Sequence, residues 1–244
     1  MIAYGKTDVG RVRVSNQDAF LIEQLTDDTV LAVVCDGMGG ANAGNVASEL
    51  AARSIVDFVK RSFRASMSSD ELGRLLCNSI TSANIVVYDM SLSSPEFNGM
   101  GTTVVAAIAS KEFTVIAHVG DSRIYLVSDE AVQLTRDHSV VQSLLESGKL
   151  TLEEAKVHPR KNVITRALGT DAEVLVDRDE LGAIEEGQTL LLCTDGLSNY
   201  LENSELKEII DNNTAERVVE VLVARANVNG GRDNITAVTV QQKG

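Results

Sequence analysis

Apolar residues are spaced in two ways along this chain, and the spacing changes several times between its ends. Short runs rich in β-branched or alternating apolar residues have the pattern of strands. These runs cover residues 19–23, 30–35, 103–109, 113–119, 123–127, 189–193 and 235–240. We therefore predict strands near the start, in the middle and at the end of the chain.

Two long segments after the second predicted strand have the period of a helix instead. Apolar residues recur every three or four positions over residues 43–64 and again over 69–91. Ser68 and Glu71 match a capping box at the start of the second helix. Shorter helices are predicted over 138–147, 152–157, 204–211 and 215–227, and Thr151 and Glu154 repeat the capping pattern before the second of these.

The order of these elements favours antiparallel sheets with helices on their outer faces. Strands and helices do not alternate regularly, as they would in a parallel doubly wound sheet. No repeat, low-complexity tract or linker rich in Pro or Ser divides the sequence, so we expect one domain over residues 1–244.

Charge and composition narrow the possible partners and location. Lys and Arg total 22 against 35 Asp and Glu, and the net charge of −13 argues against binding to nucleic acid or anionic lipid. The apolar runs are far shorter than the ~20 residues of a membrane span, and the first ten residues do not resemble a signal peptide. Three cysteines without C-x-x-C spacing indicate reduced, buried thiols. We expect a cytoplasmic protein that contacts no membrane.

Five aspartates lie at the ends of predicted strands. Asp36, Asp121 and Asp195 follow apolar runs, whereas Asp18 and Asp233 precede them. If these carboxylates meet at one edge of a sheet, their repulsion would protonate some of them unless cations supply positive charge. Converging aspartates therefore predict divalent metal ions.

The residue types around these aspartates indicate which metal would bind. No histidines cluster and no cysteines pair, so the ligands are oxygen atoms, which suit Mg²⁺ or Mn²⁺ better than zinc. Gly37 and Gly196 follow two of the aspartates and allow the backbone to approach closely. The alternative is that Asp-Gly and Gly-Asp pairs only mark turns, which is a weaker explanation for five aspartates than for one.

Eight short motifs follow one another along the chain. They are Gly10-x-x-Arg13-x-x-Asn16-Gln17-Asp18, Asp36-Gly37-Met38-Gly39-Gly40, Gly101-Thr102-Thr103, Val119-Gly120-Asp121-Ser122-Arg123, Asp137-His138-Ser139, Thr165-Arg166-Ala167-Leu168-Gly169, Thr194-Asp195-Gly196-Leu197 and Asp233-Asn234-Ile235-Thr236. Their order resembles that of the PPM family, the metal-dependent type 2C protein serine/threonine phosphatases. The motifs span nearly the whole chain, and the Asp-Gly-Met-Gly-Gly form looks most like the compact bacterial branch.

The resemblance implies an α+β fold and a metal centre. The fold is a four-layer αββα sandwich, in which antiparallel helix pairs flank two antiparallel sheets. Implied ligands are Asp36 bridging two ions, the Gly37 carbonyl on one ion, Asp195 and Asp233 on the other, Asp18 directly or through water, and Asp121 with Asp195 on a third, weaker ion.

The resemblance also implies how the reaction proceeds. A water bridging two Mn²⁺ or Mg²⁺ ions attacks phosphorus in line, and Arg13 offers parallel hydrogen bonds to the phosphate. The leaving alkoxide needs a proton, but Ala41 stands where bacterial members often have histidine. We hypothesise that a water at the Asp121 ion supplies the proton instead.

No histidine in the chain is assigned a catalytic role. His118 lies in an apolar strand, His138 lies at a helix start and His158 lies in a turn, so we expect structural roles for all three. Residues 148–169 resemble the family's variable flap beside the active site, which makes them a candidate for substrate selection; a plain surface excursion is the alternative.

The predicted function is metal-dependent hydrolysis of phosphoserine and phosphothreonine in proteins. Phosphorylated proteins are the expected partners, including a cognate serine/threonine kinase, and we expect a monomer. Two alternatives stay open: an inactive pseudophosphatase that binds phosphoproteins, and a phosphoesterase acting on small molecules.

Overall fold

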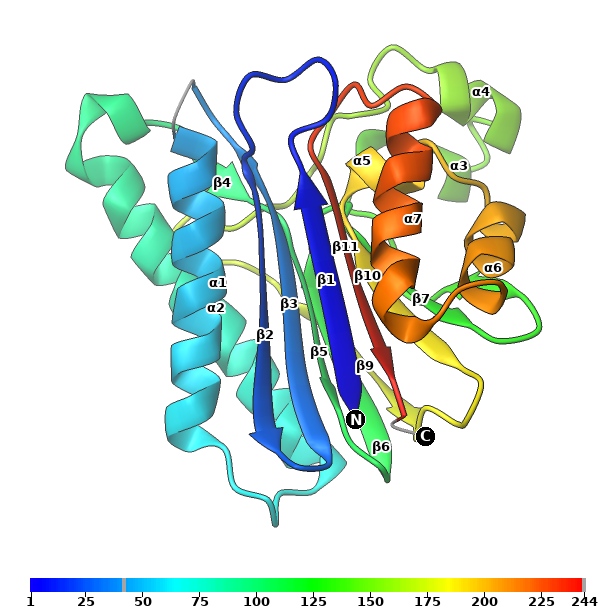
Figure 1. Cartoon of the computed structure of the whole chain (residues 1–244). Helices are drawn as coiled ribbons and strands as arrows, with labels where there is room; N and C mark the ends of the chain where they lie inside the picture. Colours follow the sequence, from blue (N-terminus) through cyan, green and yellow to red (C-terminus); the bar gives the residue numbers. More distant parts are fainter. Residues whose placement is uncertain (41–42, 243–244) are drawn as a thin grey trace.

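A computed structural model describes residues 1–40 and 43–242. Two antiparallel sheets stack on each other (Figure 1). The first sheet has the order β1 (Ile2–Asp8), β11 (Ile235–Gln241), β10 (Thr189–Cys193), β7 (Arg123–Val127) and β8 (Ala131–Gln133). The second has the order β2 (Asp18–Thr26), β3 (Thr29–Met38), β5 (Val104–Ala109), β6 (Phe113–Val119) and β9 (Asp177–Gly182), and the short β4 (Gly101–Thr102) also pairs with β3.

Helices cover the outer faces of both sheets. The long helices α1 (Ala43–Ser62) and α2 (Ser69–Ser93) pack on the second sheet. The first sheet is covered by α5 (Asp195–Ser198), α6 (Asn203–Asp211) and α7 (Ala215–Val228). Two further helices, α3 (Val140–Glu146) and α4 (Leu152–Val157), lie outside these layers at one end of the sheets, and a 3-10 turn, η1 (Pro95–Phe97), follows α2 (Figure 1).

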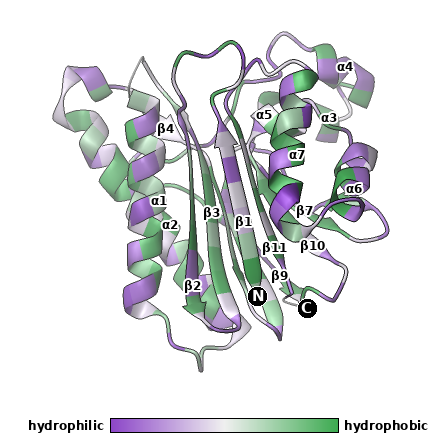
Figure 2. Cartoon of the chain, in the orientation of Figure 1, coloured by the Kyte–Doolittle hydropathy of each residue, from purple (hydrophilic) through white to green (hydrophobic). Residues whose placement is uncertain are grey.

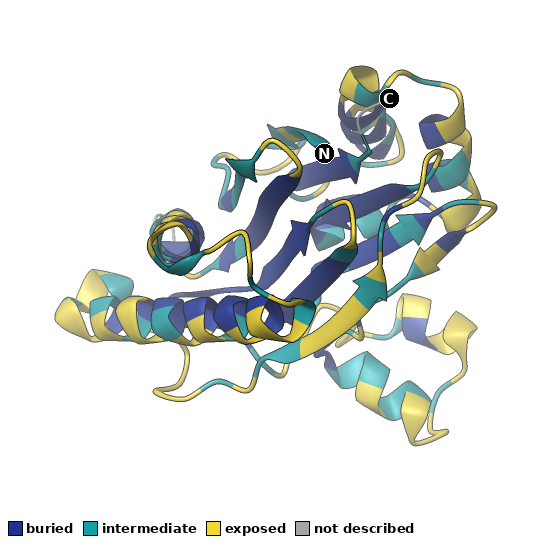
Figure 3. Cartoon of the chain, turned by 90° about the horizontal axis from the view of Figure 1, so that it is seen from below, coloured by how far each residue is buried: buried dark blue, intermediate teal, exposed yellow. Residues whose placement is uncertain are grey.

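The core consists of three apolar layers, one between the sheets and one under each set of helices. Strand β3 contributes to two of them because successive side chains of a strand point to opposite faces. Leu31, Val33 and Cys35 face the helices α1 and α2, whereas Val30, Ala32 and Val34 face the other sheet. This burial on both faces explains the continuous apolar run of β3. Figure 3 shows the buried strands between the covering helices, and in Figure 2 the helices have one hydrophilic and one hydrophobic side.

Most of the predicted elements are confirmed, with shifts of a few residues at their ends. Both capping boxes are present: Ser68 and Glu71 at α2, and Thr151 and Glu154 at α4. The predicted helix over 138–147 is shorter, because Ser139 is the N-cap and α3 begins at Val140. Strands β1, β4, β8 and β9 and the short α5 were not predicted.

The predicted α+β class with two antiparallel sheets is confirmed. Among the described residues, none of the helices combines the length and the hydropathy that crossing a bilayer requires. The three cysteines are free thiols, and Cys35 and Cys193 are buried as predicted, whereas Cys77 is partly exposed.

Candidate metal centre and its cleft

The sheet pairings bring four of the five aspartates to one end of the sandwich. Asp18 begins β2 and lies directly opposite Asp36 in the pairing with β3. Asp195 follows β10 and Asp233 precedes β11, and because these strands are antiparallel neighbours, the end of one meets the start of the other. The second sheet thus supplies one pair of carboxylates and the first sheet supplies the other.

Asp121 joins them from the turn between β6 and β7, where the chain passes from one sheet to the other. Gly120 before it has φ +110°, and a Cβ on this residue would lie 2.6 Å from Cβ of Thr103. The turn therefore needs glycine at this position, because a side chain would meet both strain and a clash. The predicted convergence of the five aspartates is confirmed.

The electrostatics of the cluster follow from this crowding. Burial raises the pKa of Asp36 well above its usual range, and the charges of Asp18, Asp195, Asp121 and Asp233 raise it further. Burial also raises the pKa of Asp18 and of Asp121 to about 7 each. Nearby positive charge would favour the ionised forms of all these groups. The protein part of the site is therefore short of positive charge.

Asp18 shows that the residues present fit a divalent cation. Its Oδ2 accepts hydrogen bonds from Thr236 Oγ1 at 2.7 Å and from Thr194 Oγ1 at 2.9 Å. Its Oδ1 is also buried, but no described residue donates to it. A buried acceptor without a partner is costly, and a cation or a water held by a cation would satisfy it. The oxygen-only donor set suits Mg²⁺ or Mn²⁺.

The two glycines that follow Asp36 and Asp195 are required by close backbone contacts. A Cβ on Gly37 would lie 2.0 Å from the carbonyl oxygen of Gly44, and one on Gly196 would lie 1.8 Å from that of Asn234. Real side chains do not tolerate such distances. The predicted close approach of the backbone at both glycines is confirmed.

Arg13 reaches the rim of the cluster from the loop between β1 and β2. Its Nη2 donates to Oδ2 of Asp233 at 2.8 Å, and its side chain is 52% exposed. The guanidinium therefore lies next to the carboxylates while one side faces solvent. The phosphate contact that the resemblance implies for Arg13 stays a prediction.

Asn234 is a site residue to which the sequence analysis assigned no role. Its Oδ1 accepts from the backbone N–H of Gln17 at 2.8 Å, and its Nδ2 donates to the carbonyls of Ser15 and Val9 at 2.9 and 3.0 Å. The side-chain amide of Asn234 thus holds the loop that carries Arg13 against the segment just before β11, which contains Asp233. The place of Asn234 in the Asp-Asn-Ile-Thr motif was the feature of the sequence from which its role could have been inferred.

A cleft of about 440 Å³ opens beside Asp121 and Asp195. Its other walls come from β7, β8 and Asp137, from residues 139–162, which include α3 and α4, and from residues 198–203 at and beyond the end of α5. We call residues 139–165 the flap, because Ser139 pairs with Ile164 at its base. Beyond it the chain returns to the body of the protein, where Leu168 pairs with Thr102. The predicted flap over 148–169 thus starts later and ends later than the excursion in the structure.

The three histidines make contacts that agree with structural roles. His118 Nε2 bonds the carbonyl of Arg136 at 2.9 Å, and His138 bonds the backbone of Gly120. His158 follows α4 as its C-cap. The loop position Ala41, where related proteins often have histidine, lies outside the described residues.

Comparison with known proteins gives one consistent result. The family model described as protein phosphatase 2C matches residues 11–236. The serine/threonine phosphatase stp of Listeria monocytogenes serotype 4b is 41% identical over 244 residues, covering 99% of this chain and 96% of that protein. The crystal structure of the serine/threonine phosphatase Stp1 from Staphylococcus aureus superposes with a TM-score of 0.92 at 34% identity, covering 99% of this chain and 95% of that one.

A further crystal structure connects the fold to metal. The catalytic domain of the serine threonine protein phosphatase PstP, in complex with two manganese ions, has a TM-score of 0.83 at 29% identity, covering 98% of this chain and 96% of that one. The fold and the acidic centre thus define a metal-dependent protein phosphatase. The chain belongs to the protein phosphatase 2C family.

Proposed function

We propose that the protein removes phosphate from phosphoserine and phosphothreonine in proteins, using Mn²⁺ or Mg²⁺ held by the five aspartates. The observation that carries this proposal is the meeting of carboxylates from both sheets around Asp36, whose raised pKa calls for nearby cations. The related phosphatases named above act on serine and threonine, by their names, and PstP holds two manganese ions. The same ion pair fits the donor set of this chain.

The ligand roles are those that the resemblance to the family implies, and the positions of the aspartates agree with them. Asp36 is central and would bridge two ions, with the Gly37 carbonyl on one of them and Asp195 and Asp233 on the other. Asp121 and Asp195 both line the cleft and would hold a third, weaker ion. When bound, the paired ions supply a water of near-neutral pKa for in-line attack on phosphorus and neutralise charge on the phosphoryl oxygens.

The residues of the chain orient the reactants. The planar guanidinium of Arg13 can give two parallel hydrogen bonds to two phosphate oxygens, after exchanging its bond to Asp233 for them. Asp18 is held by Thr194 and Thr236 through Oδ2, so its free Oδ1 points at a fixed place and can accept a hydrogen bond from water. Arg13 would thus orient the phosphate, and Asp18 would orient a water.

Proton delivery to the leaving oxygen depends on Asp121 in this proposal. No described histidine contacts the five aspartates, and the methyl side chain of Ala41 cannot act as a proton donor. Asp121 borders the cleft and would hold the third ion, and a water on that ion would supply the proton to the leaving oxygen. Replacing Asp121 by Asn should flatten the acidic limb of the rate profile with alkyl phosphates; an unchanged profile would exclude this role.

The cleft beside the centre is the proposed binding place for the peptide around the phosphorylated residue. Lys161 lines it, and Lys156 on α4 donates to Glu202 at 3.0 Å. The flap and the body of the protein thus both contribute to its walls. We further propose that a cognate serine/threonine kinase is among the phosphoprotein substrates. We also propose a cytoplasmic location, which the three free thiols support.

Release of phosphate from a phosphothreonine peptide tests it. The wild type should be active with Mn²⁺ and inactive after chelation, whereas Asp36→Asn and Asp233→Asn should lose at least about 100-fold in rate, the size of effect that removing one electrostatic group at a reaction centre has. Asp211→Asn is the matched control, because Asp211 lies on α6 and pairs with Lys207. Equal rates in all four proteins would refute the proposal, and a wild type without turnover would support a binding role instead.

A further inference from the structure

His138 exchanges two hydrogen bonds with Gly120, the residue before Asp121. The backbone N–H of His138 donates to the Gly120 carbonyl at 2.9 Å, and the Gly120 N–H donates to Nδ1 of His138 at 3.0 Å. The imidazole is buried, and it stacks on the ring of His118 with centroids 4.8 Å apart and planes 14° from parallel. The ring is thus fixed in both position and plane.

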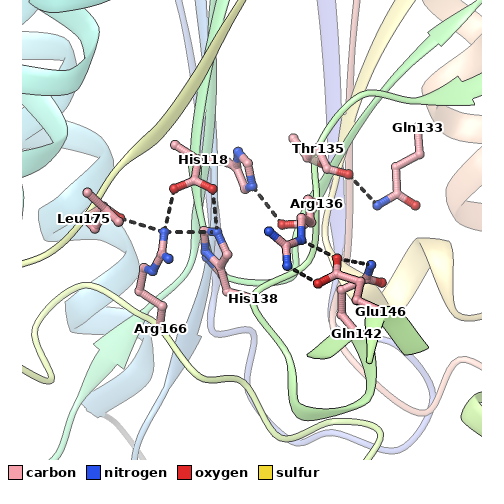
Figure 4. Close-up of polar contacts among 11 residues, drawn as sticks. His118, Gln133, Thr135, Arg136, His138, Gln142, Glu146, Arg166 and Leu175 are labelled. Carbon is pink, nitrogen blue, oxygen red and sulfur yellow. Dashed lines mark hydrogen bonds and ion pairs between the residues drawn. The ribbon is translucent and has the colours of Figure 1, made fainter. Parts of the chain in front are cut away.

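The opposite edge of the same ring contacts Asp177, the first residue of β9. Burial lowers the pKa of His138, and in the neutral ring the Nδ1 acceptor leaves the hydrogen on Nε2. This Nε2–H donates to Oδ2 of Asp177 at 3.2 Å, while Nη1 of Arg166 donates to Oδ1 at 2.7 Å. Arg166 and His138 lie side by side in Figure 4, with Nη1 and Nε2 3.1 Å apart, as two donors to one carboxylate.

This arrangement argues against a second metal site. His118, His138 and Asp177 have ligand atoms close enough to surround an ion. However, Nδ1 of His138 is occupied by Gly120, and the guanidinium of Arg166 already supplies positive charge to Asp177. The group is better explained as a structural link.

The link extends to both ends of the flap. The N–H of Thr165 donates to the His138 carbonyl at 2.8 Å, and that of Val140 donates to the Val163 carbonyl at 2.9 Å. Arg166, directly after the flap, also donates to the carbonyl of Leu175 at 3.0 Å (Figure 4). The two ends of the flap therefore meet at His138.

We propose that His138 is a positioning residue that fixes the flap and the Asp121 turn relative to each other. The inference rests on the proposed function, in which Asp121 holds a cation and the flap lines the substrate cleft. Each edge of the ring has a separate task. The Nδ1 edge holds the backbone of Gly120 and so aims the Asp121 carboxylate, and the Nε2 edge holds the base of the flap through Asp177 and Arg166.

Two substitutions separate the two tasks. In His138→Asn, the side-chain oxygen can reach the position of Nδ1 and keep the Gly120 bond, but the side chain is too short for Asp177. In His138→Gln, the amide can reach Asp177 but offers no acceptor beside Gly120. His158→Asn and His158→Gln are the controls, because His158 is also in the flap and, among the described residues, its ring accepts a hydrogen bond from the nearby Arg160 N–H alone.

The first measurement is Mn²⁺ binding without substrate, followed by the electron paramagnetic resonance signal of free Mn²⁺. His138→Gln should weaken the weakest class of bound ion about tenfold, the effect of losing one buried hydrogen bond, and His138→Asn should bind as the wild type does. The second measurement is KM. His138→Asn should raise KM for a phosphothreonine peptide severalfold and leave KM for an aryl phosphate unchanged.

The proposal is overturned if both His138 variants match the wild type in Mn²⁺ binding and peptide KM, or if both variants shift both quantities alike. Should His138→Gln fail to fold, Asp177→Asn gives a further test at a partly exposed position: peptide KM should rise with Mn²⁺ binding intact, and an unchanged KM overturns the proposal. A wild type that releases no phosphate would refute the proposed function, whereas the Mn²⁺ titration would still report on His138.

Discussion

Asp18 illustrates how single residues make the centre possible. Its carboxylate is buried, and burial alone opposes ionisation. The hydroxyls of Thr236 and Thr194 favour the ionised form by donating to Oδ2. A carboxylate held in this way keeps one oxygen for a cation or its water. The metal affinity of the site therefore depends on neutral residues as well as on the acidic ones.

Thr236→Val should weaken Mn²⁺ binding about tenfold near pH 7, because Asp18 loses a donor and its ionised form becomes less favourable. Thr239→Val is a close control. Thr239 is buried on the same strand, β11, and its hydroxyl has no partner among the described residues, so its loss should leave Mn²⁺ binding unchanged. Calorimetric titration of the two variants checks the prediction, which fails if both bind alike.

The structural elements position the site by meeting at their ends. Strand β10 stops where α5 begins, and Gly196 in the first turn of α5 packs against the backbone just before β11. This contact sets the distance between the Asp195 and Asp233 segments. It needs a residue without a side chain.

Gly196→Ala should therefore lower the free energy of unfolding by about 3 kcal/mol, the upper range for inserting a methyl group where there is no space, and should weaken Mn²⁺ binding as well. Gly182→Ala at the end of β9 meets no atom within 4 Å and should be close to neutral. Urea unfolding and Mn²⁺ titration of both variants measure the two effects. Equal stability of the two variants would contradict the role of the close contact.

The elements also show what sequence could predict. The long helices and the central strands have strong apolar periods, because they are buried against a sheet or between layers. Strands β1 and β9 were missed because both lie in outer positions with many polar residues, so their pairing with neighbours determines their structure. The contact between His138 and Asp177 could not be predicted from the sequence either, because the two residues lie far apart along the chain and only the tertiary fold brings them together.

In the molecule as a whole, the candidate metal centre joins the two sheets of the sandwich. Asp18 and Asp36 come from the second sheet, and Asp195 and Asp233 come from the ends of strands in the first sheet. Without cations the two pairs repel each other across the interface. Bound ions should therefore stabilise the fold itself, because a ligand that binds only the folded state adds to its stability.

The pH dependence of stability follows from the same repulsion. Burial and four neighbouring charges raise the pKa of Asp36 in the folded state above its ordinary value of 3.8. In the unfolded chain the proton leaves near that value, so the folded state binds more protons above it. The contribution of Asp36 therefore becomes more unfavourable as pH rises from about 4 toward its folded pKa, with a slope of at most about 1.4 kcal/mol per pH unit.

Asp36→Asn should accordingly stabilise the metal-free protein, and the gain should be larger at pH 8 than at pH 5. The same variant should lose the stabilisation that Mn²⁺ gives the wild type. Thermal unfolding in the presence of a chelator, and again with Mn²⁺, measures both. A gain in stability that shrinks as pH rises would show that the pKa of Asp36 is not raised in the folded protein.

Acidic side chains from both sheets should hold paired ions at one end of the sandwich. Crystals grown with Mn²⁺ and measured at the manganese absorption edge test it most directly. We expect two strong anomalous peaks roughly 4 Å apart on either side of the Asp36 carboxylate, with Asp195 and Asp233 next to one of them. Ordered carboxylates without anomalous density between them, at saturating Mn²⁺, would contradict it.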